Sequence, residues 1–365
     1  MRGPCYFCTM QVDFLIIGQG ISGTWLSYYM LQAGRSFLVI DRADPKASSQ
    51  LAAGLINPIT GRWSSQTWMA DTLLPFAKSA YAELGTFLGI EAIAEKSLVH
   101  FFPTADMRTS FENRMAEGCF YTREICRSGE QDRYFQFEQG YGKIAPVYTA
   151  FLEKILPAWR ARLREMQALQ EDRFDPEELD FDNGAVVYRG IQAKKVLFCD
   201  GAGGATHPLF RNLPYAANKG EALIVSIPDL PSEHIYKKGL LLVPLAKPGS
   251  WWAGSTYDRT DLNPEPTKRF RKETEARLRD WLKLPFKVDG HVAGIRPATV
   301  ERRPFVGLHP ARPEVGILNG LGTKGCSLAP YLARQLTDHL NEGHPLLAEV
   351  DVHRHTRLLI RGAGY

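Results

Sequence analysis

The segment Val12–Asp41 constrains the fold more than any other part of this 365-residue chain. It begins with VDFLII, a mostly apolar run that is typical of a strand buried on both faces of a parallel sheet. The sequence GQGISG follows at Gly18–Gly23, and a helical pattern at Thr24–Ala33 then ends at a glycine. A second apolar run, Ser36–Ile40, leads directly to an aspartate. This order predicts a βαβ unit that binds a dinucleotide.

Each defining residue of this fingerprint has a physical role. Gly18 permits the tight turn out of the strand, and Gly20 lacks the Cβ that would keep a pyrophosphate away from the backbone. Gly23 lets the helix pack closely on the sheet, and the N–H groups at the helix N-terminus face the phosphates. We expect Asp41 to accept both hydrogen bonds from a ribose diol. Its charge would repel a 2′-phosphate, which argues against NADP.

A second glycine-rich turn, GLGTKG, occupies Gly320–Gly325. It follows a strand-like run at Val315–Leu318 and precedes a helical pattern at about Ser327–Asn341. No strand with an acidic end follows it, so it cannot hold an adenosine ribose in the same way. It is either a tight strand-to-helix turn or a helix N-terminus directed at another electron-rich group of the same cofactor.

Further patterns extend this fold along the chain. Small residues at Ser48–Gly61 suit a backbone that passes close to a flat ligand, and a strand at Lys195–Cys199 leads into a third glycine turn. Helical patterns occur at Thr67–Leu88, Ala145–Met166 and Thr267–Leu284. We therefore expect an α/β protein with a Rossmann-like nucleotide-binding domain and an interleaved α+β substrate domain that has a mainly antiparallel sheet, with the substrate cleft between them. The expected nucleotide domain is 11–75, 140–215 and 294–345, the substrate domain is 76–139 and 216–293, and the tails are 1–10 and 346–365.

Charge and cysteine content exclude several other classes. The 44 Lys and Arg against 40 Asp and Glu give a net charge of +4, and the basic residues gather in three stretches. Solvent-exposed helix faces explain these basic stretches more simply than an RNA-binding surface does. These stretches are Lys154–Arg164, Lys268–Arg279 and Arg354–Arg361.

The six cysteines are too few for a disulfide framework in a chain of this length. Cys5 and Cys8 form a lone C-x-x-C pair with no second pair, which is weak evidence for a metal site, and we expect none. No cleavable signal peptide is visible, so a reducing cytoplasm is the expected compartment. Phe14–Gly34 is long enough to span a membrane, but its central glycines and serines argue against an integral membrane segment.

Several motifs occur in one order over about 11–342. They are IIGQGISG, SSQLAAGLINP, VLFCDGAGG, NKGEA, WWAGSTYD, GIRPATVERRPFVG and ILNGLGTKGCSLAP. Together they resemble the D-amino-acid oxidase superfamily of flavin enzymes, which includes glycine oxidase and sarcosine oxidase. The resemblance implies bound FAD and oxidation of the C–N bond of an amine.

The resemblance also assigns cofactor contacts. The ADP half would be held by Gly18, Gly20, Ile21, Ser22, Gly23, Asp41 and Arg42. The ribityl–flavin junction would lie near Ser48, Ser49, Gly54 and Leu55, and the pyrophosphate side near Gly201 and Ala202. The pyrimidine end of the flavin would face Gly320, Gly322, Thr323, Lys324 and Gly325. Members with covalent flavin carry a cysteine just before GIRP, where this chain has Val292, Ala293 and Gly294, so we expect non-covalent FAD.

The resemblance places the substrate carboxylate at Arg296 of GIRP, where a planar guanidinium can pair with it bidentately. A salt bridge within the sheet is the alternative, and Arg302 and Arg303 lie close enough in sequence to substitute. Tyr257 and Trp252 are candidate aromatic residues of the cleft, although a core role is at least as plausible for Trp252.

A catalytic role is also expected for Lys324, where it would add a positive charge beside the reduced flavin; the alternative is a loop residue that faces solvent.

The leading hypothesis for the function is oxidation of a small amino acid or an N-substituted glycine by hydride transfer to flavin N5, with oxygen or a quinone as electron acceptor. A second is a tRNA wobble-uridine side-chain oxidase, because GLGTKG-x-x-x-AP also resembles the oxidase domain of that modification enzyme. The basic helices fit it, but no methyltransferase domain accompanies the sequence. A third is a non-catalytic subunit with a flavin fold.

Overall fold

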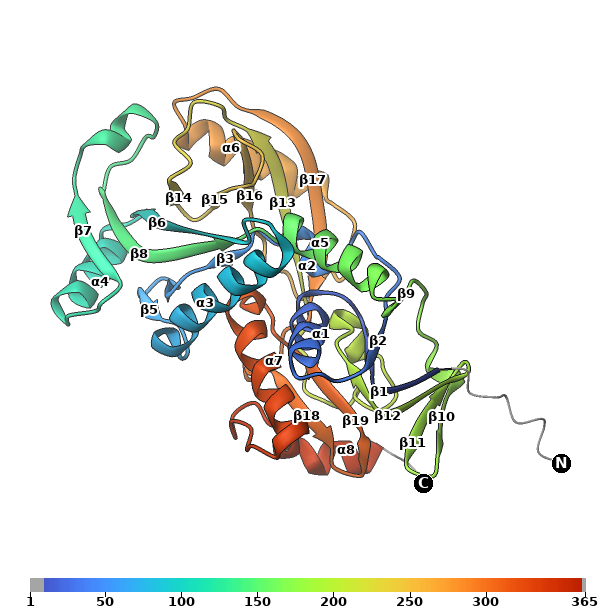
Figure 1. The fold of residues 1–365 in the computed structure, drawn as a ribbon. Coiled ribbons are helices and arrows are strands. Elements are labelled where there is room, and N and C mark those ends of the chain that lie inside the picture. The colour runs from blue at the N-terminus through green and yellow to red at the C-terminus, as the bar shows by residue number, and fades with distance from the viewer. Residues whose placement is uncertain (1–9, 363–365) are drawn as a thin grey trace. The chain divides into compact units, whose positions relative to one another are not determined.

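The structure is a computed structural model that describes residues 10–362, and these divide into two compact units (Figure 1). Unit 1 contains 10–50, 156–218 and 295–362, and unit 2 contains 51–155 and 219–294. The chain passes between the units four times, as an interleaved architecture requires. The Cys5 and Cys8 pair lies outside the described residues.

Unit 1 is built on a parallel sheet in the order β9–β2–β1–β12–β19. The antiparallel strand β18 flanks β19, and the hairpin β10–β11 pairs along the first half of β12. The bounds are β1 (Met10–Ile17), β2 (Phe37–Ile40), β9 (Leu169–Gln170), β10 (Leu179–Asp182), β11 (Ala185–Tyr188), β12 (Ile191–Phe198), β18 (Phe305–His309) and β19 (Arg312–Asn319).

The helices α1 (Ile21–Gln32) and α7 (Gly325–Glu342) pack against each other in unit 1, as the blue and red helices of Figure 1 show. Ten consecutive residues of α1, Ile21–Met30, are buried, which explains why its sequence lacks charge. α5 (Leu152–Glu165), which enters unit 1 at Leu156, leads into β9, and short helical segments complete the unit. These are η2 (Pro176–Glu178), η3 (Gly201–Ala205), η4 (Val352–His355) and α8 (Thr356–Gly362).

Unit 2 contains a sheet in the order β17–β13–β16–β15–β14–β6–β8–β3, with β7 also pairing with β8. Its pairs are antiparallel except β14 with β6, among those whose register is defined. The bounds are β3 (Leu55–Ile56), β6 (Ile93–Phe101), β7 (Thr122–Cys126), β8 (Tyr141–Ala150), β13 (Asn218–Ser226), β14 (His234–Lys237), β15 (Leu241–Pro244), β16 (Ser250–Gly254) and β17 (Lys287–Arg296). The expected α/β fold with a mainly antiparallel second sheet is confirmed.

Aromatic side chains form much of the core of unit 2. The ring of Phe135 lies 4.8 Å from those of Phe101 and Trp281 and 4.7 Å from that of Tyr236, measured between centroids. The unit also contains the hairpin of β4 (Ile59–Thr60) and β5 (Ser65–Gln66) and the segment η1 (Glu130–Arg133). Its helices are α3 (Ala70–Leu88), α4 (Ala105–Ala116) and α6 (Lys268–Trp281), and α2 (Ser48–Leu51) spans the boundary at Gln50.

One predicted helix and several predicted boundaries differ from the structure. The helix expected at Ala145–Met166 is wrong in its first part, because 145–150 belong to β8 and the helix starts only at Leu152. Segments 51–75 and 140–155 fall in unit 2, since β3 and β6 both pair with β8. The expected C-terminal tail packs on unit 1 instead, where Val352 and Leu359 are buried in its core.

The segment Phe14–Gly34 forms strand β1 and helix α1 with the glycine turn between them. Across residues 10–362, no helix combines the length and the hydropathy needed to cross a membrane.

Gly54 generates a prediction about the stability of unit 2. It has a φ of +71°, and a Cβ there would lie 1.9 Å from the carbonyl oxygen of Ala150. Gly54→Ala should therefore lower the free energy of unfolding by about 2 kcal/mol, from backbone strain and overpacking. Gly290→Ala is the control, because its nearest atom lies 3.5 Å away. Urea unfolding of the apoprotein measures both, and equal midpoints for the two variants would contradict the prediction.

Candidate functional site

Four loops of unit 1 leave the carboxyl ends of neighbouring parallel strands. They begin at Gly18 after β1, Asp41 after β2, Asp200 after β12 and Gly320 after β19. Parallel strands end at the same edge of a sheet, so the loops converge there. The chain goes from β1 to one side for β2 and to the other side for β12, which makes this edge a topological switch point. Open α/β sheets bind ligands at such a point.

Close contacts join these loops to one another. A Cβ on Gly18 would lie 2.7 Å from the carbonyl oxygen of Cys199, at the end of β12. A Cβ on Gly23 would lie only 1.8 Å from the carbonyl oxygen of Gly18, so the missing side chain lets α1 pack closely against the turn that follows β1. A Cβ on Gly325 would lie 3.4 Å from Ile21, which places the second glycine turn beside the N-terminus of α1.

The N-terminus of α1 presents hydrogen-bond donors. The Ser49 hydroxyl accepts from the N–H of Ile21 at 3.0 Å, across the turn from Gly20. Within the described residues, no hydrogen bond occupies the N–H groups of Ser22 and Gly23. A helix N-terminus with open N–H groups favours an anion, because the helix dipole adds partial positive charge there.

Asp41 already has several donors in the protein. Its Oδ2 accepts from the N–H of Gln19 at 2.8 Å, and its Oδ1 accepts from the N–H of Ala43 at 2.8 Å and from Nη1 of Arg160 at 2.7 Å. A carboxylate has about four acceptor positions, so about one is left for a ribose hydroxyl. This differs from the expectation that Asp41 accepts both hydroxyls. Its neighbour Arg42 is exposed and pairs with Asp44.

Asn319 connects the turns that follow β12 and β19. Its Nδ2 donates to Oδ1 of Asp200 and to the carbonyl oxygen of Gly201, both at 2.9 Å, and its Oδ1 accepts from the N–H of Gly320 at 2.8 Å. Burial raises the pKa of the Asp200 carboxyl to about 7. The structure thus holds Gly201 and Ala202, in η3, beside the second glycine turn.

The second glycine turn leads into α7. The N–H of Gly322 donates to the carbonyl oxygen of Pro297 at 3.1 Å, which ties the turn to the segment after GIRP. Thr323 is exposed, and the half-buried Lys324 is the N-cap of α7. Lys324 is therefore not a fully solvent-facing loop residue.

The residues expected to contact substrate occupy both units. Arg296, in unit 1, is half-buried and donates from Nη1 to Oδ1 of Asn218 at 2.9 Å. Tyr257, in unit 2, is 52% exposed and its hydroxyl accepts from Arg259. Trp252 is buried and donates from Nε1 to the carbonyl oxygen of Leu51, which is a core position.

The remaining residues predicted to contact substrate or cofactor are spread over both units. Arg302 is exposed, and Nε of Arg303 lies 3.8 Å from a carboxylate oxygen of Glu349. Gly54 and Leu55 lie in unit 2, where they join β3 to β8. Ser48 begins α2.

Sequence reasoning missed Arg160, Asp200 and Asn319 as members of the loop cluster. A signal for Arg160 exists, because it stands at an apolar position of α5, next to Trp159. Asp200 comes shortly after a buried strand, as Asp41 does, and an acidic residue in that position indicates a member of the same loop cluster. The role of Asn319 depends on strand neighbours that are distant in sequence.

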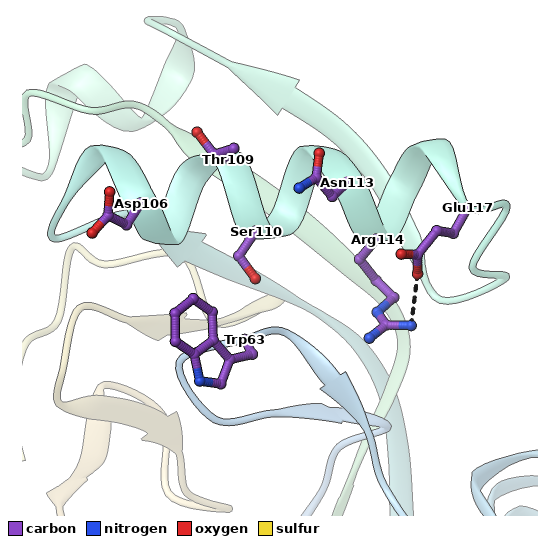
Figure 2. Close-up of a pocket in the computed structure, with 7 residues that line it drawn as sticks. All are labelled: Trp63, Asp106, Thr109, Ser110, Asn113, Arg114 and Glu117. Atoms are coloured by element: carbon purple, nitrogen blue, oxygen red, sulfur yellow. Dashed lines mark hydrogen bonds and ion pairs between the residues drawn. The ribbon is translucent and has the colours of Figure 1, made fainter.

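A separate surface pocket of about 380 Å³ lies on unit 2 (Figure 2). Figure 2 shows the indole of Trp63 facing α4, with the Ser110 side chain pointing toward it and an ion pair between Arg114 and Glu117. Trp63 is 62% exposed. The other lining residues are Asp106, Thr109 and Asn113, so no predicted site residue borders this pocket.

Acidic partners offset many of the clustered basic side chains. On α6, Arg269 pairs with Glu273, while Arg271 and Arg279 both pair with Glu275. On α5, Arg162 pairs with Glu165. This pairing favours solvated helix faces over an RNA footprint.

Residues 13–339 match the family described as DAO, FAD dependent oxidoreductase. The chain belongs to this family. It is therefore an FAD-dependent oxidoreductase, as the sequence motifs predict.

Curated relatives fall into two groups. The chain is 28% identical to a glycine oxidase of Pseudomonas aeruginosa over 366 aligned residues, covering 93% of this chain and 97% of that protein. It is 24% identical to the bifunctional tRNA 5-methylaminomethyl-2-thiouridine biosynthesis protein MnmC of Marinobacter nauticus, covering 89% of this chain and 55% of that protein. A second MnmC, from Maricaulis maris, is 38% identical over 107 residues, which cover 28% of this chain and 18% of that protein. The chain thus spans about half the length of these tRNA-modification relatives, or less.

Solved structures show the same fold. A glycine oxidase from Geobacillus kaustophilus superposes with a TM-score of 0.78 at 19% identity, covering 95% of this chain and all of that one. An iminodiacetate oxidase from Chelativorans superposes with a TM-score of 0.74 at 18% identity, covering 94% of this chain and 98% of that one.

Asp200 generates a prediction about pH. Its folded-state pKa, about 7, lies above the ordinary value of 3.8 for an aspartate, so the folded protein retains a proton that the unfolded chain loses. Its contribution to stability is therefore present at low pH and is lost as pH rises from about 4 to about 7. Asp200→Asn should flatten the fall in unfolding free energy over this range, by up to about 1.4 kcal/mol per pH unit.

Thermal melts of the apoprotein at several pH values between 4 and 8 measure this slope. Asp182→Asn, at an exposed site in the same unit, is the control and should keep the wild-type slope. An unchanged slope in Asp200→Asn would show that this carboxyl ionises normally.

Proposed function

We propose that the protein oxidises the C–N bond of a small amino acid or a secondary amine such as an N-substituted glycine. The observation that carries the proposal is the convergence of the four loops at the carboxyl edge of the parallel sheet, in a chain that belongs to the FAD-dependent family. A glycine oxidase among the curated relatives supports the substrate class.

The loop cluster fits FAD in several respects. The ADP half would lie over Gly18, Gly20, Ile21, Ser22 and Gly23, where the open N–H groups at the start of α1 meet the pyrophosphate. Asp41 would accept a ribose hydroxyl. The turn at Gly320–Gly325, with the N-terminus of α7, would face the flavin ring. Bound FAD would supply the acceptor for a hydride, at N5 of the flavin.

The protein's own residues would bind and orient the substrate. Arg296 is the residue proposed to bind a carboxylate, because its guanidinium is planar and positively charged, and its Nη1 donates to the neutral amide oxygen of Asn218. A bidentate pair with a carboxylate would fix the direction of the substrate as well as its charge. Tyr257 is the exposed aromatic residue proposed to contact substrate.

The cofactor is proposed to be non-covalent, since the residues immediately before GIRP, Val292 and Ala293, are not cysteines. Oxygen or a quinone is the proposed electron acceptor. A reducing cytoplasm is the proposed compartment, because six cysteines are too few for a disulfide framework in a chain of this length.

Anaerobic titration of the FAD-loaded protein tests the function. Glycine, sarcosine, proline and a set of D-amino acids are added in turn, and loss of the flavin absorbance identifies the substrate. Readmitted air or a quinone then identifies the acceptor, and acid precipitation should leave FAD in the supernatant. Tightly held flavin that no amine bleaches would contradict the proposal and favour a non-catalytic subunit, and colour in the pellet would contradict non-covalent binding.

Arg296→Ala should weaken binding of a carboxylate substrate by about 2–5 kcal/mol, seen as a raised KM. Arg296→Lys should recover only part of the loss, because an ammonium cannot pair bidentately. Arg302→Ala, at the exposed neighbour, should change KM little. Steady-state kinetics with the identified substrate measures KM for each variant. A wild-type KM in both Arg296 variants would show that Arg296 does not bind the carboxylate.

Lys324 is proposed to stabilise negative charge on the reduced flavin. Lys324→Met should lower the flavin reduction potential and slow flavin reduction at saturating substrate, whereas Lys324→Arg should keep both near wild type. A dye-coupled redox titration and stopped-flow reduction measure these quantities. If Lys324→Met matches wild type in both, the residue has no electrostatic role.

The matches to MnmC proteins favour a second candidate, oxidation of a side chain on a tRNA base. Binding of tRNA that weakens steeply with salt, together with bleaching by an alkylated tRNA base and not by free amino acids, would support it. The ion pairs on α5 and α6 count against a large tRNA contact there.

A further inference from the structure

Helix α5 carries an arginine on its buried face. Its buried positions include Leu152, Ile155, Leu156, Trp159 and Leu163, and Arg160 stands within this stripe with 9% of its surface exposed. Burying a charged side chain is costly unless it is paired and hydrogen-bonded. The partners of Arg160 therefore indicate what the buried charge does.

Every N–H of the Arg160 guanidinium has an acceptor. Nη1 donates to Oδ1 of Asp41 at 2.7 Å and to Oε1 of Gln19 at 3.0 Å. Nη2 donates to the main-chain oxygen of Asp41 at 3.1 Å and to Oε2 of Glu171 at 3.0 Å, and Nε donates to the same oxygen at 3.3 Å. The guanidinium thus contacts the end of β2 and the first glycine turn together.

Gln19 closes this network. It is buried, and its main-chain N–H donates to Oδ2 of Asp41 at 2.8 Å while its side-chain oxygen accepts from Arg160. Its Nε2 donates to the carbonyl oxygen of Leu156 and to Oγ1 of Thr24. A residue inside the glycine turn is therefore held to α5, to α1 and to the strand-end carboxylate.

We propose that Arg160 is a positioning residue for the adenosine half of the cofactor. It fixes the Asp41 carboxylate so that the remaining acceptor position on Oδ2 faces one ribose hydroxyl, and it fixes the turn that carries the open N–H groups. The inference rests on the proposed cofactor site in unit 1. It assigns a role to a side chain that would not itself touch the cofactor.

The charges of the network balance locally. Glu171 accepts from Arg160 and also from Arg164, so two carboxylates face two guanidinium groups. Because all donors of Arg160 are engaged, this arginine is not free to bind a 2′-phosphate. The network consequently serves an unphosphorylated ribose.

Ligand binding to the apoprotein tests this inference without any activity measurement. FAD, ADP and FMN are titrated into wild type, Arg160→Met, Arg160→Lys and Arg162→Met. ADP carries only the adenosine half, and FMN lacks it. Arg162 lies on the same helix with a 45% exposed side chain and pairs with Glu165, so it is a matched control.

Arg160→Met should weaken the binding of FAD and of ADP at least tenfold. The affinities of Arg160→Lys for these two ligands should lie between those of Arg160→Met and wild type, and those of Arg162→Met should equal wild type. Affinity for FMN should be unchanged in all variants, which a general loss of structure would not allow. If Arg160→Met does not fold, the affinities of Arg160→Lys for FAD and ADP test the inference instead. Folded Arg160 variants with wild-type affinity for FAD and ADP would overturn the inference while leaving the cofactor site in place. A wild-type apoprotein that binds neither FAD nor ADP would overturn both this inference and the proposed cofactor site.

Discussion

Parallel pairing of β1 with β2 on one side and with β12 on the other is the constraint on which the site depends. It places the first glycine turn, Asp41 and Asp200 at one edge of the sheet, and the parallel pair of β12 and β19 adds the second glycine turn. These loops come from regions up to about 300 residues apart in sequence. Only the register of buried strands brings them together.

The polar residues at this edge are held by partners from other loops. Asp41 is fixed by α5 through Arg160, and Asp200 is fixed by Asn319 at the end of β19. Each contact satisfies a carboxylate that would otherwise be costly to bury. The protein's own contacts therefore hold this edge in place, which reduces the ordering that ligand binding requires.

The first βαβ unit could be predicted from sequence because its signals are local: an apolar run, a glycine turn and an acidic strand end follow one another within about thirty residues. The segment Ala145–Met166 failed because strand β8 passes into α5 with only Phe151 between them, and β8 is defined by pairing with β6 and β3. Gly54 illustrates a third case. The sequence predicts that the backbone at Gly54 passes close to a flat ligand, which stays a prediction, and it gives no signal for the close neighbour in the structure, the carbonyl oxygen of Ala150. Arg160 and Asn319 could not be assigned from sequence because their partners are brought near only by the fold.

A crystal structure of the protein with FAD tests the central claim most directly. The account predicts one FAD per chain in unit 1, with its pyrophosphate at the N–H groups of Ser22 and Gly23, a ribose hydroxyl on Asp41, and the flavin ring beside the turn at Gly320–Gly325. FAD bound away from the carboxyl ends of β1, β2, β12 and β19, or with its adenosine half remote from Asp41, would contradict it.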